Sequence, residues 1–370
     1  MELLHLELEN FRNLSRVSRS FPSGLNLVTG PNAQGKSNLL EALFLLSVGK
    51  SLRAHREDDL IQWGAPFARI VGRTALRDGE QTVEAVLERG GAFGIRKTLR
   101  INGTHCSRLS QFVGRTPMVH FLPSDLDLVQ GEPFRRRRYL DVLGAQLHPD
   151  YLRELQSYQK ALRERNHLLR TDPRESLLQS YEILLAESGS RITLRRAALV
   201  ERLAPLAARF HREFTQEVEN LRIEYRPSIE LEEREANLLV EAFLREFARS
   251  RGQEIVRKTT LTGPHRDDLA VFVNGKDARF FGSQGQQRTA SISLKLAEAG
   301  LMEEEQGDPP LLLLDDILSE LDRARTRSLL AHLPGSRQIL ITITEEEKIR
   351  AMFTGPLSTH VIRQGEILAC

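Results

Sequence analysis

The sequence predicts an α/β protein in which one phosphate-loop nucleotide-binding domain is split by an inserted helical segment. Two motifs and one change of pattern support this fold. A phosphate-loop motif at residues 30–37 follows an apolar strand, and a second apolar strand at residues 311–314 ends in two aspartates. Most of the chain separates these motifs, and its middle part has helical rather than strand-like periodicity.

The composition is that of a globular chain of two or three lobes. Of its 370 residues, 40% are hydrophobic and 28% are charged. The net charge of +2 excludes a polycationic nucleic-acid coat but leaves a local basic face open. No apolar run approaches the roughly 20 residues of a membrane helix, so we expect no membrane partner. The acidic start and the isolated Cys106 and Cys370 disfavour a signal peptide, a disulfide framework and a zinc site, and favour a cytoplasmic location.

Residues 1–133 are expected to form the first half of the nucleotide-binding domain. Leucines alternate with polar residues at 4–8, which predicts a half-buried strand. A strand at residues 25–29 leads through a glycine-containing loop into a helix at residues 38–48. Further strands are expected at residues 68–75, 82–88, 95–101 and 118–122. Trp63 and the scattered aromatic residues are interpreted as core.

Residues 134–220 are expected to form a helical arm domain. Apolar residues recur at helical spacing on both sides of a break at residues 171–173, which predicts two long antiparallel helices. Pro205 lies inside the second helix and is expected to kink it or to separate two helices. The apolar pattern is not a sustained heptad, so a long coiled coil is not expected.

Residues 221–370 are expected to complete the nucleotide-binding domain. The pattern predicts strands at residues 221–229, 268–273, 278–281, 311–314 and 338–343, and helices at residues 237–249, 286–305 and 323–332. The pair Asn274-Gly275 predicts a hairpin with a type I′ turn.

The motif at residues 30–37 matches the phosphate-loop pattern G-x-x-x-x-G-K-[ST] between a predicted strand and a predicted helix. In such a loop, backbone N–H groups surround the β-phosphate, Lys36 reaches the β- and γ-phosphate oxygens, and the Ser37 hydroxyl binds Mg²⁺. The dipole of the following helix adds to the attraction for the anion. The expected residues of this ATP site are Gly30, Pro31, Asn32, Ala33, Gln34, Gly35, Lys36 and Ser37.

Two carboxylates after the strand at residues 311–314 predict the other half of the site. A buried parallel strand presents its carboxyl end to the ligand crevice. Asp315 is expected to bind Mg²⁺ together with Ser37, and Asp316 to polarise the attacking water. Taken alone, the same motif is also compatible with a strand that leads into an ordinary helix cap.

The loop Ser283-Gln-Gly285-Gln286 leads into a predicted helix, and a helix N-terminus attracts anions. Since the phosphate loop already serves the chain's own nucleotide, this second site best fits the γ-phosphate on another protomer. The arrangement predicts an isologous homodimer with ATP between the protomers, and Ser283, Gly285 and Gln286 on the partner's nucleotide. An ordinary N-cap is the alternative.

The order of these motifs is similar to that of the ABC/SMC/Rad50-like ATPase head, and the whole chain resembles the RecF family of DNA replication and repair proteins. The stretches that carry the resemblance are residues 10–13, 123–141, 262–268 and 313–322. Ser124 stands where this family usually has an acidic residue. A short helical arm replaces the long coiled coil of SMC and Rad50 proteins.

The resemblance implies an ATP-dependent DNA clamp of recombinational repair and replication restart. ATP would close two protomers on single- or double-stranded DNA at gaps or junctions, and slow, DNA-stimulated hydrolysis would reopen them. Asp316, Lys36 and Ser283 would be the catalytic groups. The resemblance also implies RecR- and RecO-type partners and a role in recombinase loading and the SOS response.

Three further roles follow from the resemblance. The stretch at residues 319–322, Ser-Glu-Leu-Asp, looks like the loop that couples the two sites of the dimer. A threonine, Thr342 or Thr344, takes the place of the histidine of ABC transporters. Arg12 or Arg53 is expected to approach the phosphates from the same protomer.

The most basic stretch is residues 134–213, with 16 Lys or Arg against 10 Asp or Glu. Such an excess suits sequence-independent contact with DNA phosphates. The candidate DNA-binding residues are Arg135, Arg136, Arg137, Arg138, Arg195 and Arg196. The alternatives are a solvated helix surface and, for Arg136 and Arg137, a structural role between head and arm. His265 is interpreted as structural rather than catalytic, because no nucleophile accompanies it.

Two other functions use the same phosphate loop. A small-molecule phosphotransferase would need an acceptor pocket and has no use for the Ser283 loop. A transporter ATPase subunit would need a membrane partner, and an insertion of this size is unexpected there.

Overall fold

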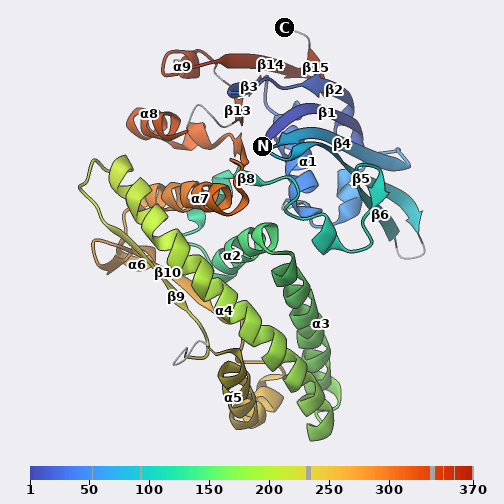
Figure 1. Ribbon diagram of the computed structural model, residues 1–370, viewed down its shortest axis with the longest axis vertical. Coiled ribbons are helices and arrows are strands. Elements are labelled where there is room, and N and C mark those ends of the chain that lie inside the picture. The colour runs from blue at the N-terminus through green and yellow to red at the C-terminus, as the bar shows by residue number, and fades with distance from the viewer. Residues whose placement is uncertain are drawn as a thin grey trace. The chain divides into compact units, whose positions relative to one another are not determined.

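The computed structural model describes residues 1–51, 53–91, 94–230, 235–333, 338–344, 346–353 and 355–368, which form three β-sheets and a set of helices (Figure 1). Cys106 is a free thiol, and Cys370 lies outside the described residues. The structure therefore does not test the expectation that these two cysteines form no disulfide.

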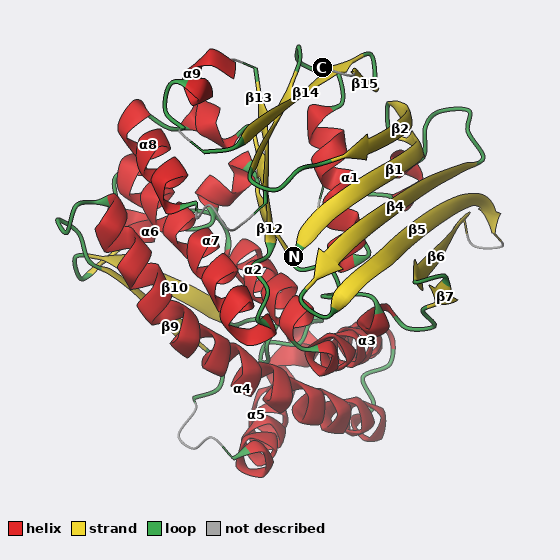
Figure 2. Cartoon of the chain, turned by 45° about the horizontal axis from the view of Figure 1, so that its top comes forward, coloured by secondary structure: helices red, strands yellow, loops and turns green. Residues whose placement is uncertain are grey.

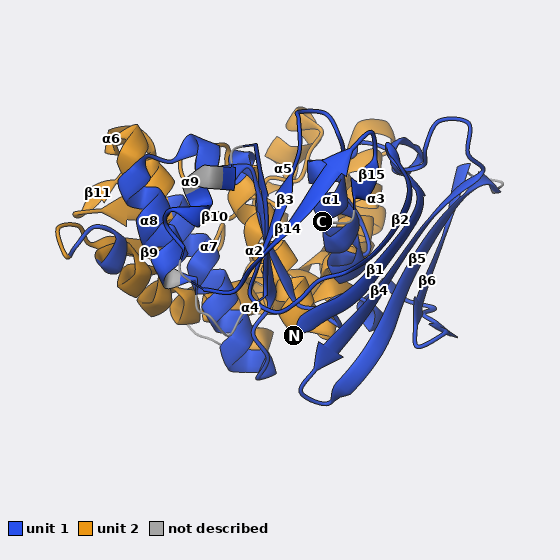
Figure 3. Ribbon diagram, turned by 90° about the horizontal axis from the view of Figure 1, so that it is seen from above, with its two compact units in different colours: residues 1–127, 213–216, 291–370 blue, residues 128–212, 217–290 orange. Residues whose placement is uncertain are grey.

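Contacts divide the chain into two compact units, shown in different colours in Figure 3. Unit 1 comprises Met1–Asp127, Glu213–Gln216 and Ser291–Cys370, and unit 2 comprises Leu128–Arg212 and Glu217–Ala290. This division differs from the expected one, which groups residues 221–290 with the two ends of the chain. The difference arises because strand and helix elements of residues 221–290 pack against helices of the middle segment.

The central sheet of unit 1 is mostly parallel and has the order β15-β14-β3-β13-β12-β8. Its strands are β3 Leu25–Thr29, β8 Met118–Phe121, β12 Leu311–Asp315, β13 Ile339–Ile343, β14 Leu357–Arg363 and β15 Glu366–Leu368. Every residue of the four neighbouring strands β3, β13, β12 and β8 is buried, as expected of a parallel sheet covered on both faces. The parallel register aligns the carboxyl ends of β3, β13 and β12 at one edge.

The second sheet of unit 1 is antiparallel and has the order β2-β1-β4-β5-β6-β7, seen to the right in Figure 2. Its strands are β1 Glu2–Phe11, β2 Leu14–Ser20, β4 Phe67–Leu76, β5 Gly79–Gly91, β6 Gly94–Ile101 and β7 Thr104–His105. Helix α1, Lys36–Val48, contacts β12 and β13 of the central sheet and β4 and β5 of this one. Most of the helix is apolar and buried, because both sheets cover it.

The remaining elements of unit 1 are short or peripheral. They are η1 Glu57–Leu60, η2 Leu109–Gln111, η3 Pro123–Asp127, η4 Ile317–Glu320, α8 Arg323–His332 and α9 Glu346–Arg350. Helix α7, Gln284–Gln306, begins in unit 2 and ends in unit 1.

Unit 2 combines long helices with a small antiparallel sheet of order β11-β10-β9. Its elements are α2 Pro133–Leu147, α3 Pro149–Thr171, α4 Glu175–Phe214, β9 Leu221–Arg226, α5 Ala236–Arg257, β10 Asp268–Val273, β11 Lys276–Asp277 and α6 Ala278–Phe281. The two long helices α3 and α4 are separated by the predicted break, at residues 172–174. Asn274 and Gly275 both have positive φ, at 49° and 77°, as a type I′ turn requires.

One local prediction in unit 2 is wrong, and one of the two alternatives expected at Pro205 is excluded. The hairpin strand after Gly275 ends at Asp277, because the Asp277 carboxylate caps the backbone N–H of Arg279 and starts the helix α6 at the residues expected to be a strand. Helix α4 continues through Pro205, so this proline does not separate two helices. Pro205 lies on the exposed face, where water can satisfy the carbonyl that lacks a donor.

The assignment of Trp63 to the core is also wrong, because its side chain is 96% exposed. A turn closed by the backbone hydrogen bond from Ala65 to Gln62, at 3.0 Å, places Trp63 and Gly64 at its tip. Gly64 has a φ of 82°, in the left-handed region. A side chain at such a tip points away from the packed interior.

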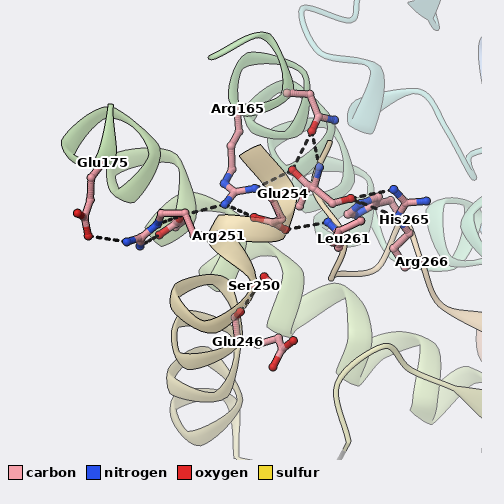
Figure 4. Close-up of polar contacts among 12 residues, drawn as sticks. Arg165, Glu175, Glu246, Ser250, Arg251, Glu254, Leu261, His265 and Arg266 are labelled. Carbon is pink, nitrogen blue, oxygen red and sulfur yellow. Dashed lines mark hydrogen bonds and ion pairs between the residues drawn. The ribbon is translucent and has the colours of Figure 1, made fainter. Parts of the chain in front are cut away.

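A buried cluster of ion pairs holds the helices of unit 2 together (Figure 4). Arg165 of α3 donates to Glu182 of α4 at 2.8 Å and to Glu254 of α5 at 2.6 Å. The side chain of Arg165 is fully buried, and those of the two glutamates nearly so. Arg251 also donates to Glu182, and Glu254 accepts from the backbone N–H of Leu261. The cluster therefore joins three helices that are distant in sequence.

We expect Arg165→Ala to destabilise unit 2 by about 3–5 kcal/mol, since it leaves a buried carboxylate without its charged partner. The measurement is urea unfolding monitored by circular dichroism. Arg163→Ala is the matched control, because this neighbouring arginine is exposed on the same helix and should change stability by less than about 0.5 kcal/mol. Equal losses in the two variants would contradict this role of Arg165.

Candidate functional site

The phosphate loop lies between β3 and α1, as predicted, and two of its glycines are required by its geometry. Gly30 has a φ of 143°, and a Cβ there would lie 2.2 Å from the carbonyl oxygen of Ile362. Gly35 has a φ of 114°, and a Cβ there would lie 2.7 Å from the side chain of Leu14. Only glycine fits both the conformation and the space at these positions.

Lys36 begins α1 and folds back over the loop. Its Nζ donates to the carbonyl oxygens of Gly30 at 2.6 Å and Pro31 at 3.0 Å. Burial lowers the pKa of Lys36, while the negative charges of Asp316 and Asp315 oppose that shift. The ammonium group is thus held between the loop and the two aspartates, where a phosphate can replace the carbonyl contacts.

Asp315 ends β12 and is the centre of a polar cluster. One carboxylate oxygen accepts hydrogen bonds from the Ser37 hydroxyl at 2.7 Å and the Thr342 hydroxyl at 3.0 Å. The other lies 3.5 Å from the guanidinium of Arg53. Ser37 and Asp315 therefore supply adjacent oxygen ligands, the donor set that Mg²⁺ uses together with nucleotide phosphates. Among the described residues, no cluster of three or more His, Cys, Asp or Glu could hold a metal by itself.

Asp316 follows with a left-handed backbone, at a φ of 52°. Its N–H donates to the Thr342 hydroxyl at 2.8 Å, so Thr342 bridges the two aspartates. Burial raises the pKa of Asp316, the Asp315 charge raises it further, and a hydrogen bond with Ser319 opposes both. Of the two threonines considered, Thr342 contacts the Asp315 carboxylate and the Asp316 backbone, and Thr344 is exposed.

Lys36, Ser37, Arg53, Asp316 and Thr342 line one pocket of about 250 Å³, Asp315 lies beneath it in contact with Ser37 and Thr342, and all of them belong to unit 1. The lining residues are Asn32, Ala33, Gly35, Lys36, Ser37, Asn38, Arg53, Asp316 and Thr342. Arg53 is the arginine that reaches the pocket. Arg12 instead pairs with the buried Glu41 on α1, through two hydrogen bonds of 2.9 and 3.1 Å.

Contacts that the sequence does not predict brace the loop. Asn13 accepts a hydrogen bond from Asn38 at 2.8 Å and donates to the carbonyl of Ala33. The side chain of Gln34 accepts from the backbone N–H of Gln364 at 2.6 Å. The position of Asn38 directly after the motif could have identified it. Gln364 is distant in sequence, and no pattern there indicates this contact.

Ser283 is exposed at the start of α7 in unit 2. Ser283 and Gln286 exchange hydrogen bonds between side chain and backbone N–H, at 2.9 and 3.2 Å, which forms a capping box. Gln286 also donates to Glu219 at 2.8 Å. The loop is therefore an N-cap, and it also presents a helix N-terminus at the surface. The neighbouring Phe280 and Phe281 are 69% and 73% exposed.

Two of the six candidate DNA-binding arginines are buried, which corrects their assignment. Arg136 forms a two-pronged ion pair with Asp268, at 2.7 and 2.9 Å, and donates to three backbone carbonyls. Arg196 pairs with Asp141 and Asp267 at 2.8 and 3.2 Å. Their charges are neutralised inside unit 2, so neither can contact DNA. The sequence shows that these arginines are present, but not which carboxylates pair with them in the fold.

The other four candidates differ in exposure. Arg137 is partly buried and donates to the carbonyl oxygen of Asp267 at 2.8 Å, which fits the structural alternative. Arg135 is partly exposed, and Arg138 and Arg195 are exposed.

His265 has structural partners on both sides of its ring. Its Nδ1 lies 2.7 Å from the hydroxyl of Tyr158, and its Nε2 lies 3.1 Å from the carbonyl oxygen of Thr260. Burial lowers the pKa of His265 to about 4, with nearby arginines adding to the effect and the Thr260 hydrogen bond opposing it. The ring is therefore neutral at neutral pH.

We expect His265 to make stability fall with acidification between its unfolded pKa of about 6.5 and its folded pKa of about 4. Above this pH window, the His265 ring is neutral in both the folded and the unfolded protein. Within the window, the ring binds a proton in the unfolded protein but not in the folded one, so acidification favours unfolding. The contribution is roughly 3 kcal/mol. Urea unfolding at pH 7, 6, 5 and 4 should give a shallower dependence for His265→Gln than for the wild type. The control His55→Gln, at an exposed position, should keep the wild-type slope.

Comparison with known proteins identifies relatives over the whole chain. The RecF/RecN/SMC N terminal domain family model matches residues 2–365. A protein from Geobacillus sp. (strain WCH70), described as DNA replication and repair protein RecF, is 40% identical over 375 residues, which cover 100% of this chain and 99% of that protein. The relative from Geobacillus thermodenitrificans (strain NG80-2) carries the same description, with 40% identity and 100% coverage of both chains.

A solved structure of the recombination mediator protein RecF with ATP, in the RecFOR pathway, has a TM-score of 0.88 and 35% identity, covering 99% of this chain and 97% of that one. An SMC head bound to the C-terminal winged-helix domain of ScpA has a TM-score of 0.59 at 14% identity, which indicates a common fold. Among the described residues, no helix is both long and apolar enough to span a membrane.

Proposed function

Because this chain belongs to the RecF family of DNA replication and repair proteins, we propose that it is an ATP-dependent DNA-binding protein of recombinational repair and replication restart. The observation that carries the proposal is the pocket in which the phosphate loop, Asp315, Asp316 and Thr342 meet. A phosphotransferase or a transporter subunit has no observation in its favour, since the relatives described as DNA repair proteins match the full chain.

The pocket supports binding of ATP with Mg²⁺. The backbone N–H groups at the start of α1 and Lys36 would hold the phosphates, since both lie at the phosphate loop. Ser37 and Asp315 would hold Mg²⁺, which when bound neutralises phosphate charge and orients the γ-phosphate. Arg53, on the pocket wall, would add a second positive charge.

Asp316 is the group we propose to orient the attacking water. Its backbone is fixed by Thr342, and its carboxylate is near Lys36 and Asp315. An aspartate reaches one methylene less far than the glutamate of many ABC heads. This shorter reach supports slow hydrolysis, used as a switch, which DNA would stimulate.

The exposed start of α7 supports an ATP-sandwiched homodimer. A helix N-terminus with Ser283 at the surface can accept the γ-phosphate of a nucleotide bound to a second copy. Hydrolysis would remove that contact and reopen the dimer. Residues 319–322 follow Asp316 after two intervening residues and would transmit the change between the two sites.

The biological setting of the proposal is a cytoplasmic clamp at DNA gaps and junctions, on single- and double-stranded DNA. The solved RecF structures belong to the RecFOR pathway, and we propose RecR- and RecO-type mediators as partners on that basis. The clamp would support recombinase loading and the SOS response.

We expect ATP·Mg²⁺ to double the mass of the wild type from the monomer's 42.0 kDa in light scattering, and Ser283→Arg to abolish this doubling. The arginine would obstruct the phosphate contact between protomers. Ser180→Arg is the matched control, because it places the same side chain at another exposed serine of unit 2. If ATP binds and the wild type stays monomeric even with DNA, the proposed role of Ser283 is wrong.

We expect Asp316→Asn to retain ATP binding, to reduce the hydrolysis rate by a factor of about 100 or more, and to prolong the ATP dimer. The amide keeps the size of the side chain but cannot accept the proton of water. Phosphate release and the dimer's lifetime after removal of free ATP are the two measurements. Asp58→Asn, at an exposed position of the same unit, should leave both unchanged. Hydrolysis at the wild-type rate by Asp316→Asn would exclude this role.

A further inference from the structure

We propose that Ser51 is a positioning residue for ATP, which holds Arg53 at the wall of the nucleotide pocket through a hydrogen bond to the buried Glu41. This inference rests on the proposed ATP binding and adds a residue to that site. All three residues belong to unit 1. The described residues that line the pocket include Arg53 but neither Ser51 nor Glu41, so the role of these two is indirect.

Arg53 is the side chain whose position matters. It lines the pocket, and its guanidinium lies 3.5 Å from the Asp315 carboxylate. The side chain is 40% exposed, and a long arginine side chain at a surface can adopt many conformations. How often the guanidinium meets a phosphate in the pocket therefore depends on how firmly the backbone at Arg53 is held.

The Ser51 hydroxyl holds that backbone. Its oxygen accepts hydrogen bonds from the backbone N–H of Arg53 at 2.9 Å and from that of Ala54 at 2.8 Å, and its hydrogen is donated to Glu41. A hydroxyl has one hydrogen to donate and two lone pairs that accept, so these three bonds use its whole capacity. The backbone at Arg53 is thus tied to one carboxylate.

Glu41 is a firm anchor for this bond because it is fixed from a second side. Its side chain is buried on α1, and the guanidinium of Arg12 donates to both of its carboxylate oxygens, at 2.9 and 3.1 Å. Arg12 balances the negative charge, and Ser51 donates to an oxygen that Arg12 also contacts. Hydrogen bonds to a carboxylate are stronger than those between neutral groups.

Helix α1 connects this anchor to the nucleotide. Glu41 follows Ser37 by four residues, so the two side chains share one side of the helix and are about 6 Å apart along its axis. After the helix, Gly49 adopts a left-handed φ of 69°, and the chain folds back so that Ser51 reaches Glu41. The helix that carries the proposed Mg²⁺ ligand Ser37 therefore also carries the anchor of Arg53.

The alternative is that Ser51 only stabilises the turn after α1, as serine hydroxyls commonly do by accepting from nearby backbone N–H groups. Loss of the hydroxyl would then lower the free energy of unfolding, and any effect on ATP binding would not require Arg53. The two roles differ in whether the effect of Ser51 on ATP binding disappears when the Arg53 side chain is absent.

The test is a double-mutant cycle on the full chain. Ser51→Ala removes the hydroxyl, Arg53→Ala removes the group that it positions, and a double variant carries both changes. Ser51→Thr keeps a hydroxyl at the same position. Ser23→Ala is the matched control, because it makes the same change at an exposed serine of unit 1. Titration calorimetry with ATP·Mg²⁺ gives each Kd, and urea unfolding shows that each variant is folded.

We expect Arg53→Ala to weaken ATP binding by about tenfold, because it removes a charge-assisted contact with phosphate. Ser51→Ala should weaken binding by about three- to fivefold in the wild type but by less than about twofold in Arg53→Ala, where no guanidinium remains to be positioned. Ser51→Thr, which keeps the hydroxyl, and Ser23→Ala should bind ATP within about twofold of the wild type.

Three results would overturn the inference and leave the proposed ATP binding intact. They are an equal loss from Ser51→Ala with and without the Arg53 side chain, wild-type affinity of Ser51→Ala, and a loss in Ser51→Thr as large as that in Ser51→Ala. Wild-type affinity of Arg53→Ala would overturn the inference together with the proposed role of Arg53. Failure of the wild type to bind ATP would overturn the proposed function, and the inference with it.

Discussion

The site depends on the parallel pairing of β3, β13 and β12, which brings residues from the two ends of the chain to one edge of the central sheet. Asp315 lies opposite Thr342, and Thr342 lies opposite Val28 of the strand that leads into the phosphate loop. This register allows Ser37 and Thr342 to donate to the same carboxylate oxygen. Because side chains alternate along a strand, a shift of β12 by one residue would turn Asp315 to the other face and dismantle the site.

A second constraint lies in unit 2, where arginines act as internal connectors. Arg136, Arg165 and Arg196 are among the largest fully buried side chains, and each pairs with carboxylates from distant segments. A buried charge is stable only when paired, so these arginines fix which helices and loops pack together. The basic composition of residues 134–213 therefore reflects folding to a large extent.

What remains at the surface follows from this packing. The buried side of α4 takes Arg196 and the apolar residues, and the exposed side keeps Arg191, Arg195, Arg202 and Arg209. In the same way, the capping box at Ser283 both begins α7 and exposes its N-terminus, beside two exposed phenylalanines. An exposed apolar pair of this kind is typical of an interaction surface, and the proposed homodimer would supply its partner.

The sequence by itself determined the nucleotide-binding part of this protein, because the phosphate loop and the Asp315-Asp316 pair are local motifs whose residue types dictate their chemistry. It also determined most strands, the long helices and the break between them, since those depend on periodicity. Only the tertiary structure decided that Arg136 and Arg196 are buried, that residues 217–290 pack with the middle helices, and that Trp63 is exposed. The physical reason is that burial depends on partners distant in the chain, such as Asp268 for Arg136, and no local pattern encodes such pairings.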